Sequence, residues 1–144
     1  MKNLIVAVLT AALAVFAAGC ANTGAKNSAE GKQGVVVQVS DGDPKTWNQA
    51  LNVVRNIQDA YGKDKVEVEV VVFGNGAPLL QYDSPLANRI EQTLASGAHV
   101  SMCENTMRGR KLTKSDMLPN IGYVSAGVIE IIEKQNAGWA VIRP

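Results

Sequence analysis

Short runs rich in β-branched residues alternate with longer segments of helical patterning, and this alternation limits the possible folds more than any other feature. The strand-like runs cover residues 35–39, 65–73, 98–103, 121–124 and 139–142. Strands that alternate with helices form mostly parallel sheets, because each crossover returns the chain to the same edge. The pattern therefore predicts a single three-layer α/β domain with a mostly parallel sheet of about five strands and helices on both faces.

Turn and cap residues mark the ends of three helices between these runs. Asp43 can cap the first helix with Pro44 at its first position, and Gly62 stands where a C-terminal glycine is expected. The corresponding boundary residues of the second and third helices are Ser84 and Gly97, then Ser125 and Gly138. The segments 74–78 and 104–119 are expected to be loops.

The first twenty residues are typical of an export signal. A start with one positive charge, at Lys2, precedes an apolar run that is too short to span a bilayer, and small residues follow. Ala18-Gly19-Cys20 resembles a lipobox, in which the cysteine is lipidated, although the usual leucine is replaced by Ala17. We expect an exported, periplasmic lipoprotein anchored through Cys20, with ordinary cleavage after Ala21 as the alternative.

The remaining chain divides into a polar tether, residues 21–33, and a domain, residues 34–144. The tether is small and polar with no apolar periodicity. Of the 14 Lys and Arg residues, Lys2 belongs to the export signal, so the rest of the chain has equal numbers of basic residues and of the 13 acidic residues. This balance gives no reason to expect nucleic-acid binding, and we expect contact with a membrane only through the N-terminal lipid.

Cys103 is the strongest candidate for chemistry, since it is the only cysteine of the domain. It stands at the carboxyl end of the third predicted strand, the edge where parallel sheets place their ligands. A helical turn beginning at Glu104 would favour its thiolate, and basic residues follow at Arg108, Arg110 and Lys111. A buried cysteine that packs as a small apolar residue is the alternative.

His99 and a soft-metal cluster are two other interpretations of the same strand. His99 lies four residues before Cys103, about 13 Å away on an extended strand, which is too far for it to act as the base of a dyad. We expect it to be partly buried. His99, Met102, Cys103 and Met107 are ligand types that suit Cu(I), but alternation turns Met102 to the other face. We therefore expect no metal.

The order and spacing of several short motifs resemble the DsrE/DsrF family of sulfur-handling proteins. The segments that carry the resemblance are GAHVSMC at 97–103, TMRG at 106–109, FGNG at 73–76, VSAGV at 124–128, Gln135 and GWA at 138–140. The resemblance implies that the cysteine at the strand end, Cys103, carries sulfane sulfur as a persulfide. It also implies an oligomer, commonly built from threes, and no cofactor.

Our working hypothesis is an exported sulfur carrier or sulfurtransferase-like protein with Cys103 as its reactive group. Arg108, Arg110 and Lys111 are candidates to hold an anionic donor such as thiosulfate, and a partner thiol would accept the sulfur. The best-understood members of the family are cytoplasmic, so an exported member needs a different donor and acceptor. The alternative is a non-catalytic exported module that serves oligomerisation or partner binding.

Overall fold

Five parallel strands form one sheet in the computed structural model, which describes residues 31–144. The export signal, Cys20 and most of the tether lie outside the described residues. Every strand pair is parallel and the order across the sheet is β4-β3-β2-β1-β5. The strands are β1 Gln33–Val39, β2 Val66–Val72, β3 His99–Cys103, β4 Gly122–Val124 and β5 Ala140–Ile142. The predicted fold class is confirmed.

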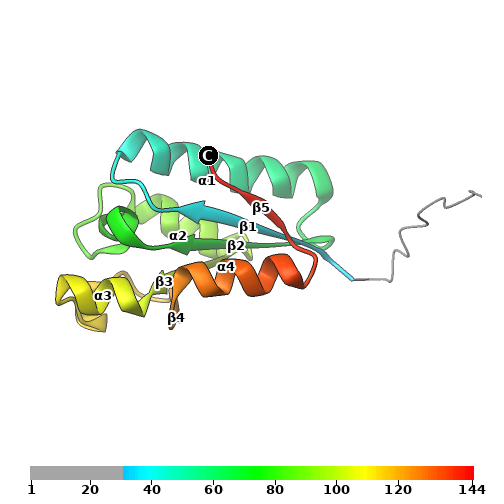
Figure 1. The fold of residues 1–144 in the computed structure, drawn as a ribbon. Coiled ribbons are helices and arrows are strands. Elements are labelled where there is room, and N and C mark those ends of the chain that lie inside the picture. The colour runs from blue at the N-terminus through cyan, green and yellow to red at the C-terminus, as the bar shows by residue number, and fades with distance from the viewer. Residues whose placement is uncertain (1–30) are drawn as a thin grey trace, which may run out of the picture. The chain divides into compact units, whose positions relative to one another are not determined.

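Helices cover both faces of this sheet, as Figure 1 shows, with α1 and α2 on one face and α4 on the other. The helices are α1 Pro44–Tyr61, α2 Ala87–Ala95, α3 Glu104–Arg110 and α4 Gly127–Asn136. Two 3₁₀ helices accompany them, η1 Gly74–Leu80 and η2 Lys114–Asp116. The prediction of a loop at 74–78 was therefore wrong, and so was that of an uninterrupted loop at 104–119.

The larger part of the core lies between the sheet and the pair α1 and α2. Alternate residues of β2, from Val66 to Val72, face this side, where they meet the apolar stripe of α1. A smaller cluster under α4 contains Val36, Val71 and Ile131. Each fully buried Val or Leu contributes about 1.5–3 kcal/mol, so the side covered by two helices supplies most of the apolar stabilisation.

The sequence predicts both ends of α1 correctly. The Asp43 side chain accepts a hydrogen bond from the Lys45 N–H, and Pro44 begins the helix. Gly62 ends it with φ +89°, and its N–H donates to the Gln58 carbonyl. One position of the stripe differs from expectation, because Gln58 is buried while Tyr61 is exposed.

The two later helices begin differently from the prediction. The Ser84 hydroxyl accepts from the Leu86 N–H, and α2 starts only at Ala87. The N-cap of α4 is Ala126, which offers no side-chain acceptor, rather than Ser125. In both places the serine forms or adjoins the turn before the helix, so the predicted boundaries were wrong by one or two residues.

Within residues 31–144, no helix has the length and apolar character that crossing a bilayer requires.

Candidate functional site

Cys103 lies where the carboxyl edge of the sheet meets the start of α3. It is the last residue of β3 and the N-cap of α3, and only 4% of its surface is exposed. Its Sγ accepts a hydrogen bond from the Thr106 N–H at 3.5 Å. Cys103 stands at the strand end as predicted, and the segment after it, which was expected to be a loop, begins with the helix α3, so the thiol faces a backbone donor rather than apolar side chains alone.

Polar groups from two elements lie near this sulfur. Besides the Thr106 N–H, the Thr106 hydroxyl and the N–H of Gly127, the first residue of α4, lower the pKa of the thiol, as does the Asn105 N–H, whose own hydrogen bond goes to the Ser125 carbonyl at 3.2 Å. The Thr106 oxygen is itself held from outside α3, because the Gly74 N–H donates to it at 2.9 Å. The surroundings of Sγ therefore depend on η1, α3 and α4, which are far apart in the sequence.

Two glycines allow these donors to reach the sulfur. A Cβ on Gly127 would lie 3.1 Å from the Phe73 ring and 3.2 Å from Val71, so a glycine lets the first residue of α4 approach the sheet. Gly74 has φ +58°, a left-handed conformation that glycine adopts without steric cost. Both residues stand within motifs that the sequence singles out.

The balance of these effects favours the thiolate. Burial raises the pKa of the Cys103 thiol, but the hydrogen bonds from the Thr106 side chain and from the N–H groups of Gly127, Thr106 and Asn105 outweigh it. The net pKa is lower than that of an ordinary cysteine. A larger thiolate fraction at neutral pH makes Sγ a better nucleophile toward sulfur.

The three basic residues singled out from the sequence stand at the other end of α3. Arg108 and Arg110 lie in its last turn, and Lys111 ends it in a left-handed conformation. All three are exposed, and the arginine side chains donate to those of Asn105 and Asn75 respectively. The lowered pKa of Cys103 thus comes from its hydrogen-bond donors rather than from these cations.

The structure corrects the prediction for His99. Its side chain is 66% exposed, not partly buried, and its Nε2 lies 4.0 Å from a Glu67 carboxylate oxygen. His99 stands at the amino end of β3 and Cys103 at its carboxyl end, so the pair forms no dyad. Met102 faces the core on the α1 side. Among residues 31–144, no group of three or more His, Cys, Asp or Glu side chains is arranged to hold a metal.

A buried ion pair beneath α4 has no counterpart in the sequence analysis. Glu69 of β2 is 5% exposed, and it accepts from the Ser101 hydroxyl at 2.7 Å and from Lys134 Nζ at 3.1 Å. Lys134 also lies over the Trp139 ring, 4.1 Å from its centroid. Glu69 and Lys134 are far apart in the sequence, so no local pattern indicates that this lysine covers the carboxylate.

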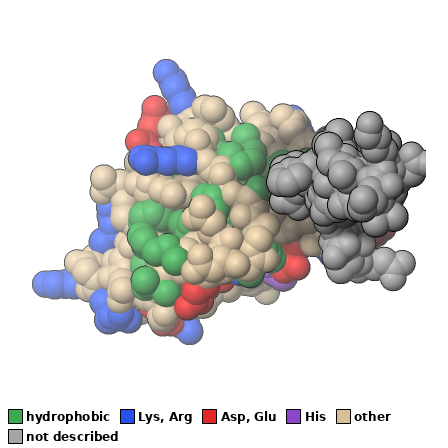
Figure 2. Space-filling model, turned by 45° about the vertical axis from the view of Figure 1, so that its right-hand side comes forward, with side chains coloured by type: hydrophobic (Ala, Val, Ile, Leu, Met, Phe, Trp, Pro, Cys, Tyr) green, Lys and Arg blue, Asp and Glu red, His purple; other side chains and the backbone are tan. Residues whose placement is uncertain are grey.

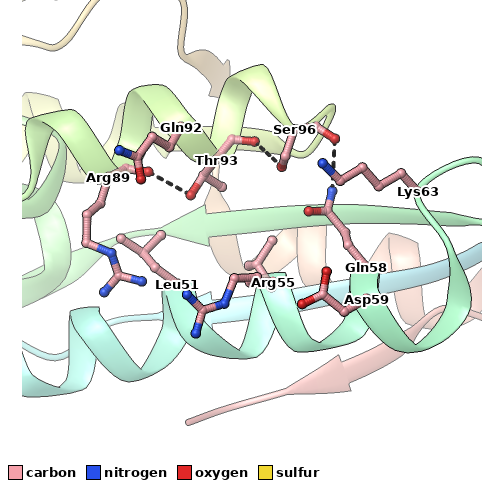
Figure 3. Close-up of a pocket in the computed structure, with 10 residues that line it drawn as sticks. Leu51, Arg55, Gln58, Asp59, Lys63, Arg89, Gln92, Thr93 and Ser96 are labelled. Atoms are coloured by element: carbon pink, nitrogen blue, oxygen red, sulfur yellow. Dashed lines mark hydrogen bonds between the residues drawn. The ribbon is translucent and has the colours of Figure 1, made fainter.

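A polar cavity of about 280 Å³ lies between α1 and α2, away from Cys103. Figure 3 shows charged and polar side chains along it, including Arg55, Asp59 and Arg89. Among the lining residues, the Gln58 amide donates a hydrogen bond at 3.2 Å to the carbonyl of Ser96, the C-cap residue of α2. This cavity explains the buried glutamine of α1 and contributes nothing to the surroundings of the thiol.

Comparison with known proteins assigns the chain to a family. The model of the DsrE/DsrF-like family matches residues 31–144. The chain belongs to this family, which is linked to sulfur relay. No curated protein matches.

Solved structures share the same fold. A protein of unknown function from Methanobacterium thermoautotrophicum matches with a TM-score of 0.75 and 29% identity, over 78% of this chain and 100% of that one. A conserved protein of unknown function from Bacteroides thetaiotaomicron matches with a TM-score of 0.64 and 13% identity, over 78% and 95%. The ychN protein of E. coli has a TM-score of 0.63 and 11% identity, over 78% and 99%. The last two show the fold alone.

Proposed function

We propose that this protein is an exported sulfur carrier that holds sulfane sulfur as a persulfide on Cys103. The observation that carries the proposal is the buried Sγ at the carboxyl edge of the sheet, which accepts a hydrogen bond from the Thr106 N–H at the start of α3. Membership of a family linked to sulfur relay supports it. A lone thiol with a lowered pKa, placed where parallel sheets present their reactive groups, is suited to attack a sulfur donor.

The loading step needs no cofactor. With thiosulfate as the donor, the Cys103 thiolate attacks the outer sulfur, a new S–S bond forms, and sulfite leaves with the electron pair of the broken bond. No external oxidant is consumed, because the transferred sulfur keeps its sulfane oxidation level. Arg108, Arg110 and Lys111 are exposed at the far end of α3 and form a basic cluster. We propose that this cluster attracts an anionic donor such as thiosulfate.

Burial of the thiol favours a small donor. The residue is covered by the first turns of α3 and α4, so a compact anion reaches Sγ more readily than a folded partner does. The same burial is the observation that favours the alternative, a non-catalytic module in which Cys103 only packs. Reactivity of the thiol separates the two functions.

We further propose that the working form is an oligomer of this chain. Figure 2 shows apolar side chains gathered on the face that it presents. On α4, Val128, Ile129 and Ile132 are 52%, 50% and 46% exposed, at spacings that put them on one side of the helix. Sedimentation of the wild type beside Ile129→Asp tests this, since a charge in a subunit contact lowers the mass and a charge at a free surface leaves it unchanged.

Export and lipid attachment through Cys20 complete the proposal. They place Cys103 in an oxidising compartment, where a persulfide must be shielded or passed on quickly. Fractionation of cells expressing the wild type and Cys20→Ala tests the anchor. The lipidated wild type is expected in the membrane fraction. Cys20→Ala is expected as a soluble exported protein or as an unprocessed precursor. Lipidation is contradicted if the two proteins have the same processed mass and the same distribution between the fractions.

Intact-mass analysis after exposure to thiosulfate or polysulfide tests the central function. The wild type is expected to gain one sulfur atom, which a reductant removes, while the matched variant Cys103→Ser gains none. Sulfur carried by Cys20 would remain in Cys103→Ser and so can be recognised. An unlabelled wild type, or equal labelling of both proteins, contradicts the persulfide and leaves the interaction module.

A further inference from the structure

The polar cavity between α1 and α2 carries more positive than negative charge. Arg55, Lys63 and Arg89 line it, and among the lining residues, all of which belong to the described part of the chain, Asp59 is the one carboxylate. Figure 3 shows Arg55 reaching from α1 and Arg89 from α2 into the space between the helices, while Lys63 extends toward the end of α2. Three basic side chains against one acidic side chain favour an anionic ligand.

These basic side chains form no ion pair with a carboxylate in the described part of the chain. The ion pairs found within residues 31–144 join other side chains, and none includes Arg55, Lys63 or Arg89. Asp59 lines the same cavity but is not in an ion pair with any of them. The cavity therefore contains positive charge that no carboxylate of residues 31–144 neutralises at close range.

Arg89 is held in position by neutral partners. One of its terminal nitrogens donates to the backbone and side-chain oxygens of Asn48, and the other donates to the Asn52 side chain at 2.9 Å. Both partners belong to α1, so the guanidinium is fixed between the two helices and keeps its full charge. These bonds do not use all of the N–H donors of a guanidinium, so an anion would meet further donors whose position is already set. A preorganised donor lowers the entropic cost of binding.

The floor of the cavity between the two arginines is apolar. Leu51 and Val54 line it and are each 2% exposed, and Figure 3 shows Leu51 between Arg55 and Arg89. Two carboxylates joined by a short carbon chain match this arrangement, because each end meets an arginine and the chain covers the apolar floor. An inorganic dianion such as sulfate, which is polar over its whole surface, would leave the floor without an apolar partner.

We propose that this cavity binds a short aliphatic dicarboxylate. One carboxylate lies against Arg89, the other lies against Arg55, and the carbon chain lies over Leu51. The cavity volume of about 280 Å³ is at the lower end of the range for ligand sites, roughly 300–1,000 Å³, so a ligand of four or five carbon atoms fits better than a nucleotide. The site lies away from Cys103, and its occupancy does not depend on the carrier function.

Isothermal titration calorimetry of the full protein at low ionic strength tests this site, with succinate as the probe. We expect one succinate to bind per chain with a dissociation constant in the millimolar range. Sulfate tests whether charge alone is sufficient, and butyrate, which has one carboxylate on a chain of the same length, tests the need for two charged ends. Both are expected to bind at least about tenfold more weakly than succinate, the effect of losing one hydrogen bond to a charged group. Cys103→Ser should bind succinate as the wild type does.

Three variants separate this cavity from the other basic surface of the protein. Arg55→Gln is expected to weaken succinate binding by about tenfold, and because Arg55 is exposed, its replacement leaves the core unchanged. Asp59→Asn removes the one acid of the lining and is expected to strengthen binding. Arg108→Gln is the matched control, since it removes an exposed arginine from the far end of α3 and leaves the cavity intact. Its affinity for succinate should equal that of the wild type.

Three results would overturn the inference. A wild type without saturable succinate binding removes the site. Sulfate that binds as tightly as succinate shows that the site responds to charge alone and not to a dicarboxylate. Equal weakening by Arg55→Gln and Arg108→Gln shows that succinate associates with basic surface in general. None of these results bears on the carrier function, which sulfur loading of Cys103 tests separately.

Discussion

Removal of the Lys134 charge should expose the cost of a buried carboxylate beneath α4. Lys134 Nζ lies 3.1 Å from one oxygen of Glu69, while the Ser101 hydroxyl donates to the other at 2.7 Å. Lys134→Met keeps the length of the side chain but removes its ammonium group, which leaves Glu69 with a single hydrogen bond. The substitution removes the Glu69 ion pair together with the contacts of the ammonium group with Glu130 and the Trp139 ring, at nearly constant packing.

The magnitude follows from the burial of the two partners. Breaking a fully buried pair costs about 3–5 kcal/mol, because the remaining charge is uncompensated. Lys134 keeps 26% of its side chain exposed and Glu69 keeps 7%, so water screens part of this pair. We expect Lys134→Met to lower the free energy of unfolding by about 2–3 kcal/mol at neutral pH. The double variant Glu69→Gln with Lys134→Met should recover most of the lost free energy of unfolding.

The pH dependence has a definite sign. Burial lowers the pKa of Lys134, but Glu69, then Glu130 and Glu67, outweigh it, and the net pKa is raised. A raised folded-state pKa means that the stabilisation is complete below the unfolded value, near about 10.4, and is lost as the pH rises through the folded value. The wild type should lose this part of its stability in strongly alkaline solution, and Lys134→Met should not.

Urea unfolding followed by far-UV circular dichroism, at one fixed protein concentration, measures these differences. The double variant is the control, because it removes both charges and keeps an acceptor for Ser101. A loss below about 1 kcal/mol in Lys134→Met would refute the reasoning, since a buried, unpaired carboxylate cannot cost so little. A double variant as unstable as the single one would refute it equally.

Three further outcomes follow from the structure. Gly127→Ala should lower the free energy of unfolding by about 1–3 kcal/mol, because the new Cβ meets the Phe73 ring at 3.1 Å. It should also raise the pKa of the Cys103 thiol, because the Gly127 N–H is displaced. Unchanged urea unfolding and unchanged alkylation of Cys103 would contradict this. The Cβ added by Gly34→Ala would overlap the Trp139 ring, so the ring must move and its fluorescence should shift to the red; an unshifted spectrum would show that the contact is absent. The rate of Cys103 alkylation should rise with pH at a lower midpoint in the folded protein than in urea, because the folded pKa of the thiol is depressed; the associated stability is present above the unfolded value and lost as the pH falls through the folded one, and equal midpoints in the folded and unfolded protein would contradict the account.

The sequence predicts the sheet, because each strand and the longest helix carry strong local signals. The β-branched runs and the pair Asp43 and Gly62 are sufficient to define the order of elements and the ends of α1. The short helices leave no such signal. In α3 only Met107 is buried, so no apolar period exists, and η1 contains two glycines and a proline that favour a turn over a helix.

The site was predictable in position but not in chemistry. Cys103 follows from the strand end, since any residue there faces the carboxyl edge. The donors do not follow, because Gly127 and Gly74 contribute backbone N–H groups, which carry no residue-type signature, from segments distant in the sequence. The hydroxyl of Thr106 was visible only as part of a motif, and its orientation depends on η1, which the sequence did not predict.

Cyanolysis of the loaded protein tests the central claim most directly. Cyanide attacks the outer sulfur of a persulfide, thiocyanate forms, and the cysteine leaves as its thiolate, so thiocyanate counts sulfane sulfur. After exposure to thiosulfate and removal of excess donor, the wild type should release close to one thiocyanate per chain and Cys103→Ser none. Equal release from the two proteins, or no release from a folded wild type, would contradict a persulfide on Cys103.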